Sequence, residues 1–189
     1  MPFEFESTSI DEVQLIKPKV FSDQRGFFAE MYRSDQFMKA GIGQEFVQDN
    51  ISKSNRGILR GLHYQIENQQ AKLVFCPYGK IFDVAVDLRI GSPTYGKYVS
   101  AELGEENQHL LYIPEGFAHG FCVLSKEALF LYKCSDYYNP DGERGIAWND
   151  PQISIDWPLN EPVISDKDSN LPNLEDVNNS DLPLFDTIT

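Results

Sequence analysis

The sequence has few of the residues on which several protein classes depend. Only three of its 189 residues are cysteines, and they include no Cys-x-x-Cys pair. A disulfide framework or a zinc knuckle needs more cysteines at characteristic spacings. We therefore expect Cys76, Cys122 and Cys134 to be buried thiols in a reducing compartment, and we predict a cytoplasmic protein.

The sequence also lacks an excess of positive charge and long apolar runs. Sixteen lysines and arginines face 29 acidic residues, giving a net charge of −13, which opposes general binding to nucleic acid or to an anionic membrane. No apolar run reaches the roughly 18 residues of a membrane-spanning helix. The first residues lack the basic and then apolar pattern of a signal peptide. We predict no nucleic-acid partner and no membrane partner.

Signature motifs of several enzyme classes are absent as well. There is no Gly-x-Ser-x-Gly, no Walker loop, no dinucleotide fingerprint and no internal repeat, so serine hydrolases and the common nucleotide-binding folds lose support. His63, His109 and His119 form no His-x-His pair and have no carboxylate at ligand spacing. We therefore expect no metal site.

What the sequence does contain is a succession of short strand-like segments. In residues 80–89 large apolar side chains alternate with two aspartates and an alanine, which predicts a half-buried strand. Further segments follow at intervals of roughly 8–12 residues, with turn residues between them, and this spacing favours a β-sandwich or barrel. A short strand is expected at 153–157. A helix is expected at 35–40, with Ser34 as its cap.

The stretch from Gly57 to Gln65 places an arginine and a histidine in an apolar, strand-like run. Arg60 can hold a phosphate and His63 can move a proton near neutral pH. Simple alternation puts the two on opposite faces of a strand. Gly61, which lies between them, predicts a bulge that re-aims one of them; alternatively, Arg60 reaches its ligand by a long bend. An ordinary strand with two polar residues on one side is the other interpretation.

Other polar residues are candidates to complete a site. A diphosphate could be held by converging cations, because arginine forks match phosphate oxygens; the candidates are Arg25, Arg60, Lys72 and Arg144. The tyrosines within 130–139 are able to transfer a proton or to stack on a base. A carboxylate in the segment 164–168 could orient a histidine. The alternative for each is an ordinary surface charge or core aromatic residue.

Seven motifs, in order and in one register from about residue 10 to 168, resemble the dTDP-4-dehydrorhamnose 3,5-epimerase family. These motifs are Phe46-Val-Gln-Asp-Asn-Ile-Ser-Lys-Ser54, Leu59-Arg-Gly-Leu-His-Tyr-Gln65, Phe82-Asp-Val-Ala-Val-Asp-Leu-Arg89, Ser92-Pro-Thr-Tyr-Gly-Lys97, Ile113-Pro-Glu-Gly-Phe-Ala-His-Gly-Phe121, Leu131-Tyr-Lys133 and Tyr137-Tyr-Asn-Pro140.

The resemblance implies an all-β, cupin-type jelly-roll barrel with a few short peripheral helices. It implies one domain over residues 1–168 and a homodimer to which the N-terminal strands contribute. Residues 169–189 lie outside the match; their composition, with four acids and no lysine or arginine, predicts an acidic polar tail in which the stretch Leu182-Pro-Leu-Phe185 could dock on the body. No cofactor and no metal are expected. The implied reaction epimerises C3 and C5 of dTDP-4-dehydro-6-deoxy-D-glucose, giving dTDP-4-dehydro-L-rhamnose through an enolate in dTDP-L-rhamnose biosynthesis. The alternatives are a single-position epimerase, a ketoisomerase on a related sugar nucleotide, and a sugar-nucleotide-binding cupin without catalysis.

The resemblance also implies a role for each matching residue. His63 matches the general base, Asp168 its orienting partner and Tyr132 the general acid. Lys72 is expected to face the keto oxygen, and Tyr138 to stack on the thymine. The remaining matches are substrate-contact positions: Arg25, Glu30, Gln48, Asp49, Asn50, Arg60, His119, Glu143 and Lys167.

Overall fold

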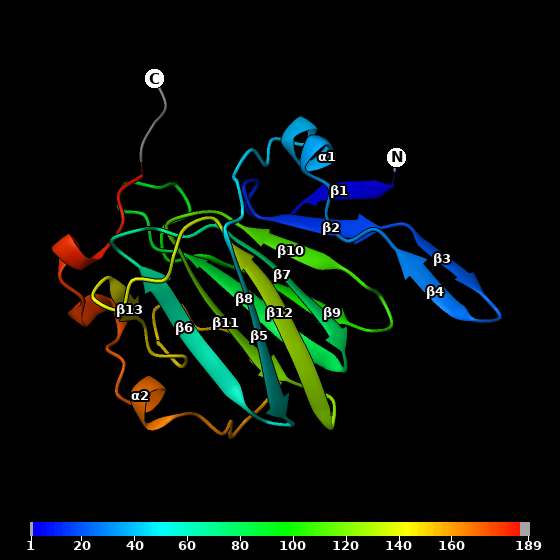
Figure 1. Ribbon diagram of the computed structural model, residues 1–189. Helices are drawn as coiled ribbons and strands as arrows, with labels where there is room; N and C mark the ends of the chain where they lie inside the picture. The colour runs from blue at the N-terminus through cyan, green and yellow to red at the C-terminus, as the bar shows by residue number, and fades with distance from the viewer. Residues whose placement is uncertain (1, 186–189) are drawn as a thin grey trace.

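Two antiparallel β-sheets packed face to face form the body of the chain (Figure 1). The computed structural model describes residues 2–185. In spatial order the six-stranded sheet contains β1 (Phe3–Ser7), β2 (Gln14–Pro18), β10 (Leu110–Ile113), β7 (Lys72–Tyr78), β12 (Glu127–Cys134) and β5 (Gln48–Asn55). The five-stranded sheet contains β13 (Glu143–Gly145), β6 (Leu59–Gln65), β11 (Phe117–Val123), β8 (Lys80–Asp87) and β9 (Tyr98–Gly104).

The path of the chain is that of a jelly roll. Successive strands alternate between the two sheets from β5 to β8 and again from β10 to β13, so each sheet is built from segments distant in sequence. Among the described residues the sheets are not closed into one barrel by strand pairing. The predicted all-β, cupin-type class is confirmed.

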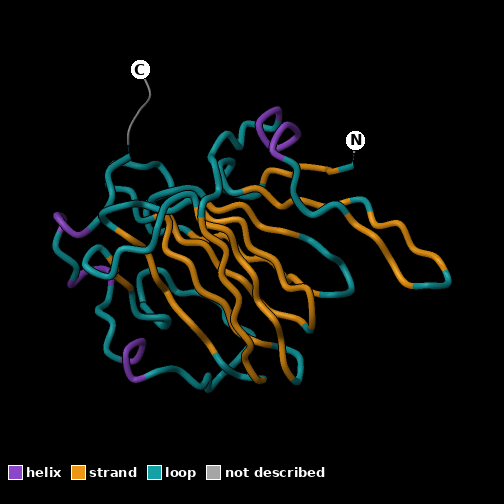
Figure 2. The backbone as a smooth tube through the Cα atoms, viewed as in Figure 1, coloured by secondary structure: helices purple, strands orange, loops and turns teal. Residues whose placement is uncertain are grey.

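Smaller elements lie around this body. The hairpin of β3 (Val20–Asp23) and β4 (Gly26–Ala29) extends away from both sheets (Figure 1). Figure 2 shows the short helical turns at the periphery: α1 (Ser34–Lys39), α2 (Asp166–Ser169), η1 (Leu174–Asp176) and η2 (Asn179–Asp181). None of the helices between residues 2 and 185 is long and apolar enough to cross a membrane.

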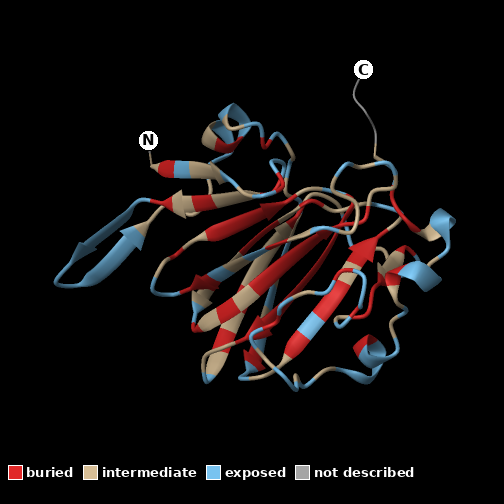
Figure 3. Ribbon diagram, turned by 180° about the vertical axis from the view of Figure 1, so that it is seen from behind, coloured by how far each residue is buried: buried red, intermediate tan, exposed pale blue. Residues whose placement is uncertain are grey.

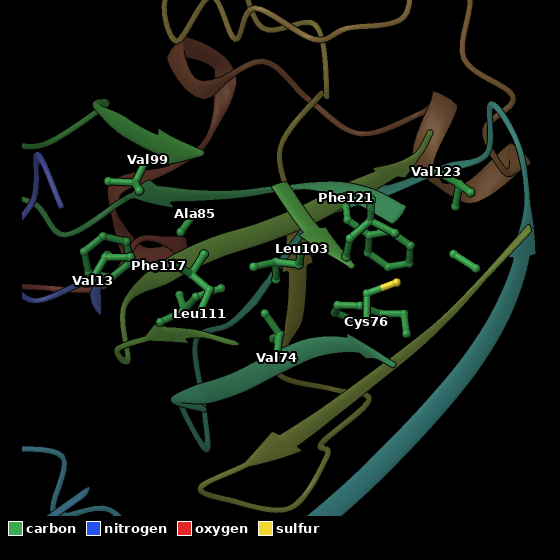
Figure 4. Close-up of a cluster of buried hydrophobic side chains, with 14 of the residues drawn as sticks. Val13, Val74, Cys76, Ala85, Val99, Leu103, Leu111, Phe117, Phe121 and Val123 are labelled. Carbon is green, nitrogen blue, oxygen red and sulfur yellow. The ribbon is translucent and has the colours of Figure 1, made fainter. Parts of the chain in front are cut away.

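Three apolar clusters hold the elements together. The first fills the space between the two sheets and includes Val74, Leu111 and Phe121 (Figure 4). The second covers the outer face of the five-stranded sheet with residues from the segment 146–182. The third packs α1, through the fully buried Phe37, against the outer face of the six-stranded sheet.

The prediction that residues 80–89 form a half-buried strand is wrong in one respect. The strand is present as β8, but both of its faces are buried. In Figure 3 the exposed residues gather instead in the projecting hairpin and the peripheral helical turns. Ile81 and Ala85 pack into the first cluster, while Val84 and Val86 pack into the second. The strand is covered twice because the irregular segment beyond residue 146 lies over its outer face.

Two local predictions are also corrected. The expected helix is present as α1, but its N-cap is Arg33, which has the extended backbone of a cap (φ −151°, ψ 111°), whereas Ser34 already belongs to the helix. Residues 153–157 form no strand. The carboxylate of Asp150 instead accepts the backbone N–H groups of Gln152 and Ile153 and turns the chain there.

The segment expected to be an acidic polar tail lies against the body as far as it is described. Leu174 and Leu182 are buried in the second cluster. Beyond them, the backbone N–H of Phe185 donates to the carbonyl of Ile90 at 3.0 Å. Residues 186–189 lie outside the described part of the chain. The polar composition of this segment therefore does not prevent it from covering one face of a sheet.

Candidate active site

A cavity of about 580 Å³ opens between the two sheets, next to a second of about 300 Å³. The two share four lining residues, Asn50, His63, Lys72 and Tyr132. Strands β5, β7 and β12 supply one wall, and β6 and β11 supply the other. Volumes of this order suit a small-molecule ligand.

A β-bulge in β6 brings Arg60 and His63 to the same wall. In the pairing of β6 with β11, Arg60 lies opposite Phe121, and His63 lies opposite His119. The two β11 residues are two positions apart, while the two β6 residues are three apart. The extra residue cancels the alternation that would otherwise separate Arg60 from His63, and both line the larger cavity. The predicted bulge is confirmed.

The bulge requires glycine at two positions. Gly61 has φ +124°, a conformation that side-chain-bearing residues rarely adopt. A Cβ atom on Gly61 would lie 2.6 Å from the Cα of Gly120. A Cβ atom on Gly120 would in turn lie 2.8 Å from the carbonyl oxygen of Arg60. The two strands approach this closely because neither residue has a side chain.

His63 is held by a buried carboxylate. Its Nε2 lies 2.8 Å from Oδ1 of Asp168, which is only 5% exposed. The other carboxylate oxygen accepts the N–H of Gly61 at 3.2 Å, so one aspartate fixes both the histidine and the bulge. Burial raises the pKa of Asp168, but the hydrogen bonds, above all that from His63, outweigh burial and hold this pKa below its usual range. An ionised Asp168 accepts the Nε2 proton and leaves Nδ1 of His63 free to act as a base.

A second histidine–carboxylate pair lies beside the first. Nε2 of His119 is 3.0 Å and 3.1 Å from the two oxygens of Asp83, which is completely buried. Burial lowers the pKa of His119, and the charge of Lys72 lowers it further against the opposing effect of Asp83. Burial also raises the pKa of Asp83, so desolvation opposes the charged form of both members of this pair. Sequence reasoning missed Asp83, because alternation assigned it to the solvent side of a half-buried strand.

Lys72 and Tyr132 come from the opposite wall. In the pairing of β7 with β12, Lys72 lies opposite Cys134, two positions from Tyr132, so both side chains face the cavity. Lys72 is partly accessible from the cavity, yet desolvation lowers the pKa of its ammonium group. Burial has the opposite effect on Tyr132, because it raises the pKa of a hydroxyl that is neutral when protonated. The site thus sets the amine of Lys72 and the phenol of Tyr132 opposite the imidazole of His63.

A hydrogen-bond network borders the smaller cavity. Glu143 accepts hydrogen bonds from the hydroxyl of Tyr138 at 2.7 Å and from Nζ of Lys167 at 2.6 Å. The side chain of Gln48 accepts the N–H of Tyr138 and donates to Asn50. These partners hold the half-exposed ring of Tyr138 at the cavity mouth, where it is accessible for stacking.

The chain does not bring every expected residue to the cavity. Arg25 lies in the turn of the projecting hairpin, where it pairs with Asp23, and Glu30 follows that hairpin. Asp49 alternates with Asn50 along β5 and pairs with Lys133. The roles assigned to Arg25, Glu30 and Asp49 stay predictions.

Arg144, expected among the diphosphate-binding cations, turns away from the two cavities. Its Nε donates to Oδ1 of Asp181 at 2.8 Å. The reason is strand alternation, because its neighbour Glu143 occupies the cavity side of β13. Among residues 2–185 no group of three or more His, Cys, Asp or Glu side chains is placed to hold a metal ion.

Comparisons with known proteins give a consistent result. The family model described as dTDP-4-dehydrorhamnose 3,5-epimerase matches residues 7–176. The chain is 56% identical over 165 residues to the dTDP-4-dehydrorhamnose 3,5-epimerase of Shigella flexneri, covering 86% of this chain and 91% of that protein. It is 54% identical over 162 residues to the protein of the same name from Neisseria gonorrhoeae, covering 85% of this chain but only 49% of that longer protein.

A solved structure resembles the whole chain. It is that of dTDP-6-deoxy-D-glucose-3,5-epimerase from Legionella pneumophila in complex with dTDP-4-keto-L-rhamnose. Its TM-score is 0.95 at 47% identity, and the match covers 97% of this chain and 99% of the other.

We expect Gly61→Ala to destabilise the protein by about 2–4 kcal/mol, because the alanine would be strained at φ +124° and would contact Gly120. The matched control is Gly43→Ala, since a Cβ at Gly43 meets nothing within 4 Å. Urea unfolding of both variants measures the difference. Equal stabilities for the two variants would show that β6 and β11 do not need this close approach.

Proposed function

The chain belongs to the dTDP-4-dehydrorhamnose 3,5-epimerase family, and from this premise we propose the reaction that it catalyses. The protein epimerises C3 and C5 of dTDP-4-dehydro-6-deoxy-D-glucose to give dTDP-4-dehydro-L-rhamnose, a step of dTDP-L-rhamnose biosynthesis. The observation that carries the proposal is the placement of His63 and Tyr132 on opposite walls of one cavity, with Lys72 beside Tyr132.

The chemistry follows from the substrate's C4 ketone. The ketone acidifies the hydrogens on C3 and C5, and Nδ1 of His63 removes one of them. The electron pair moves onto the C4 oxygen, where the ammonium group of Lys72 stabilises the enolate; such charge stabilisation is strong in a partly desolvated cavity. Tyr132 then returns a proton to the same carbon from the opposite face, which inverts its configuration. The second carbon requires the sugar to reorient.

The remaining lining residues suit the nucleotide portion. Arg60 and Lys167 bring positive charge to the larger cavity for the diphosphate. Tyr138 offers its ring to the thymine at the mouth of the smaller cavity. Gln48, Asn50 and Glu143 supply the polar groups that orient the ligand there. His119 contributes a buried imidazole next to the base.

We propose that the protein is a homodimer assembled through its projecting hairpin. Phe21 and Phe28 are paired across β3 and β4 and are 51% and 68% exposed, which is unusual for phenylalanines unless a partner covers them. The same hairpin carries Arg25, with Glu30 just beyond it. Both match substrate-contact positions but lie away from this chain's own cavity, so the hairpin is placed to supply them to the cavity of the partner.

We propose the cytoplasm as the location of the protein. Cys76, Cys122 and Cys134 are buried free thiols, which suits a reducing compartment. Cell fractionation tests this location, and recovery of the protein from an oxidising compartment would contradict it.

Proton exchange in deuterated water tests the proposed reaction. With the 4-keto-6-deoxy sugar nucleotide, NMR is expected to show deuterium entering at both C3 and C5. Exchange at one carbon only would identify a single-position epimerase, and exchange at neither carbon would exclude an epimerase. His63→Ala is expected to slow both exchanges by about 10²–10⁴-fold while dTDP binding is retained. The control is His109→Ala, since His109 lines neither cavity.

The dimer is tested by sedimentation velocity. The wild-type protein is expected to sediment as a dimer, and the double variant Phe21→Ser/Phe28→Ser to sediment mainly as a monomer, because it removes the exposed aromatic pair. Met38→Ser is the control, since Met38 is 64% exposed, between the values of Phe21 and Phe28, but lies on α1. A wild-type monomer at micromolar concentration would contradict the proposal.

A further inference from the structure

The segment that follows η1 makes specific contacts with the sheet that carries the site. The family model ends at residue 176, and the chain continues along the outer face of the five-stranded sheet. Leu182 is buried in the second apolar cluster. The backbone of Ile90 then exchanges hydrogen bonds with Pro183 and Phe185, at 2.8 Å and 3.0 Å. The guanidinium group of Arg89 lies over the ring of Phe185 at 4.9 Å. Residues 177–185 are therefore anchored beyond Asp181.

Asp181 binds both members of one cross-strand pair. In the pairing of β13 with β6, Arg144 lies directly opposite Tyr64. The carboxylate of Asp181 accepts Nε of Arg144 at 2.8 Å, and its backbone carbonyl accepts the hydroxyl of Tyr64 at 2.8 Å. A single residue thus ties the edge strand to its neighbour from outside the sheet.

The pairs on either side of this contact carry site residues. Glu143 lies opposite Gln65, and Gly145 lies opposite His63. The side chains of His63, Gln65 and Glu143 line the cavity wall, while Arg144 points the other way. The pair held by Asp181 is therefore flanked by the two pairs that form this part of the wall.

Strands β6 and β13 depend on the contacts of Asp181 to different degrees. His63 is held independently by Asp168 and by the pairing of β6 with β11. Glu143 belongs to β13, a three-residue strand at the edge of the sheet, which among the described strands pairs with β6 alone. Loss of the Asp181 contacts should therefore displace Glu143 more than it displaces His63. Tyr138 and Lys167, which bond to Glu143, should move with it.

We propose that Asp181 is a positioning residue for the nucleotide-binding wall, acting through Arg144 and Tyr64 on Glu143. This inference rests on the proposed function, because it assumes that the wall bordered by Tyr138 and Glu143 receives the nucleotide. The segment beyond residue 176 is then part of the working enzyme.

Steady-state kinetics of variants in the full chain test this role. Asp181→Ala is expected to raise KM for the sugar nucleotide about fivefold, equivalent to about 1 kcal/mol, and to weaken dTDP binding similarly. Its kcat should stay within about twofold of the wild-type value, because His63 keeps its own supports. Asp181→Asn keeps an acceptor oxygen for Arg144 and should restore KM to within about twofold of wild type.

Matched controls separate positioning from general stability. Glu175→Ala removes an exposed carboxylate that makes no ion pair or hydrogen bond with described residues, and it should leave KM unchanged. The double variant Arg144→Ala/Asp181→Ala should raise KM no more than Arg144→Ala alone, because both changes break one contact. Thermal unfolding, recorded in parallel, ensures that all variants are compared while folded.

The outcomes distinguish this inference from the proposed function. If the wild-type protein exchanges protons at C3 and C5 but Asp181→Ala has the wild-type KM, the role of Asp181 is overturned and the proposed function stands. An equal rise in KM for Glu175→Ala overturns it as well. A wild-type protein without exchange contradicts the proposed function itself.

Discussion

The close approach of two glycines determines which side chains the cavity contains. Because Gly61 and Gly120 have no Cβ, β6 can include one extra residue while it remains paired with β11. That extra residue turns His63 to the same face as Arg60. Asp168 stabilises the arrangement from outside the strand, since one of its oxygens holds the backbone at the bulge and the other holds the imidazole. The position of His63 and the conformation of the local backbone are therefore one structural feature.

The jelly-roll path of the chain places other polar side chains opposite His63. Alternation of the chain between two sheets places groups from distant segments on facing walls: an imidazole on one side, and an ammonium group and a phenol on the other. The proposed inversion needs a proton donor and a proton acceptor on opposite faces of the sugar, and the two facing sheets supply one wall on each side. In the proposed reaction, partial desolvation would also strengthen the effect of Lys72 on a developing enolate.

Much of the fold could be predicted from local patterns, because strand alternation and turn residues are short-range signals. The strands β6 and β8 fall within the stretches where these patterns place them, and Gly61 correctly indicated the bulge. The double burial of β8 could not be predicted in this way, since the segment that covers its outer face has no regular period. For the same reason alternation assigned Asp83 to solvent, although it pairs with His119 inside the protein.

Contacts in the site between residues far apart in the sequence could not be predicted from strand alternation and residue spacing. Nothing in the spacing joins His63 to Asp168, which lies 105 residues away; only the family resemblance indicated this pair. Charge alone placed Arg144 with the diphosphate-binding cations, but its position on β13 turns it towards Asp181 instead. Arg25 illustrates a different limit, because it lies in the turn of the projecting hairpin, away from the cavities of this chain, and its role stays a prediction.

We propose that Asp168 fixes the tautomer of His63, with the proton on Nε2 and Nδ1 free. Long-range ¹H–¹⁵N correlation spectra of histidine-labelled protein at neutral pH measure this directly, since the two ring nitrogens give distinct signals when one carries the proton. We expect His63 to be protonated at Nε2 and unprotonated at Nδ1, and we expect Asp168→Asn to change this pattern. A proton on Nδ1 of His63 in the wild-type protein would contradict it.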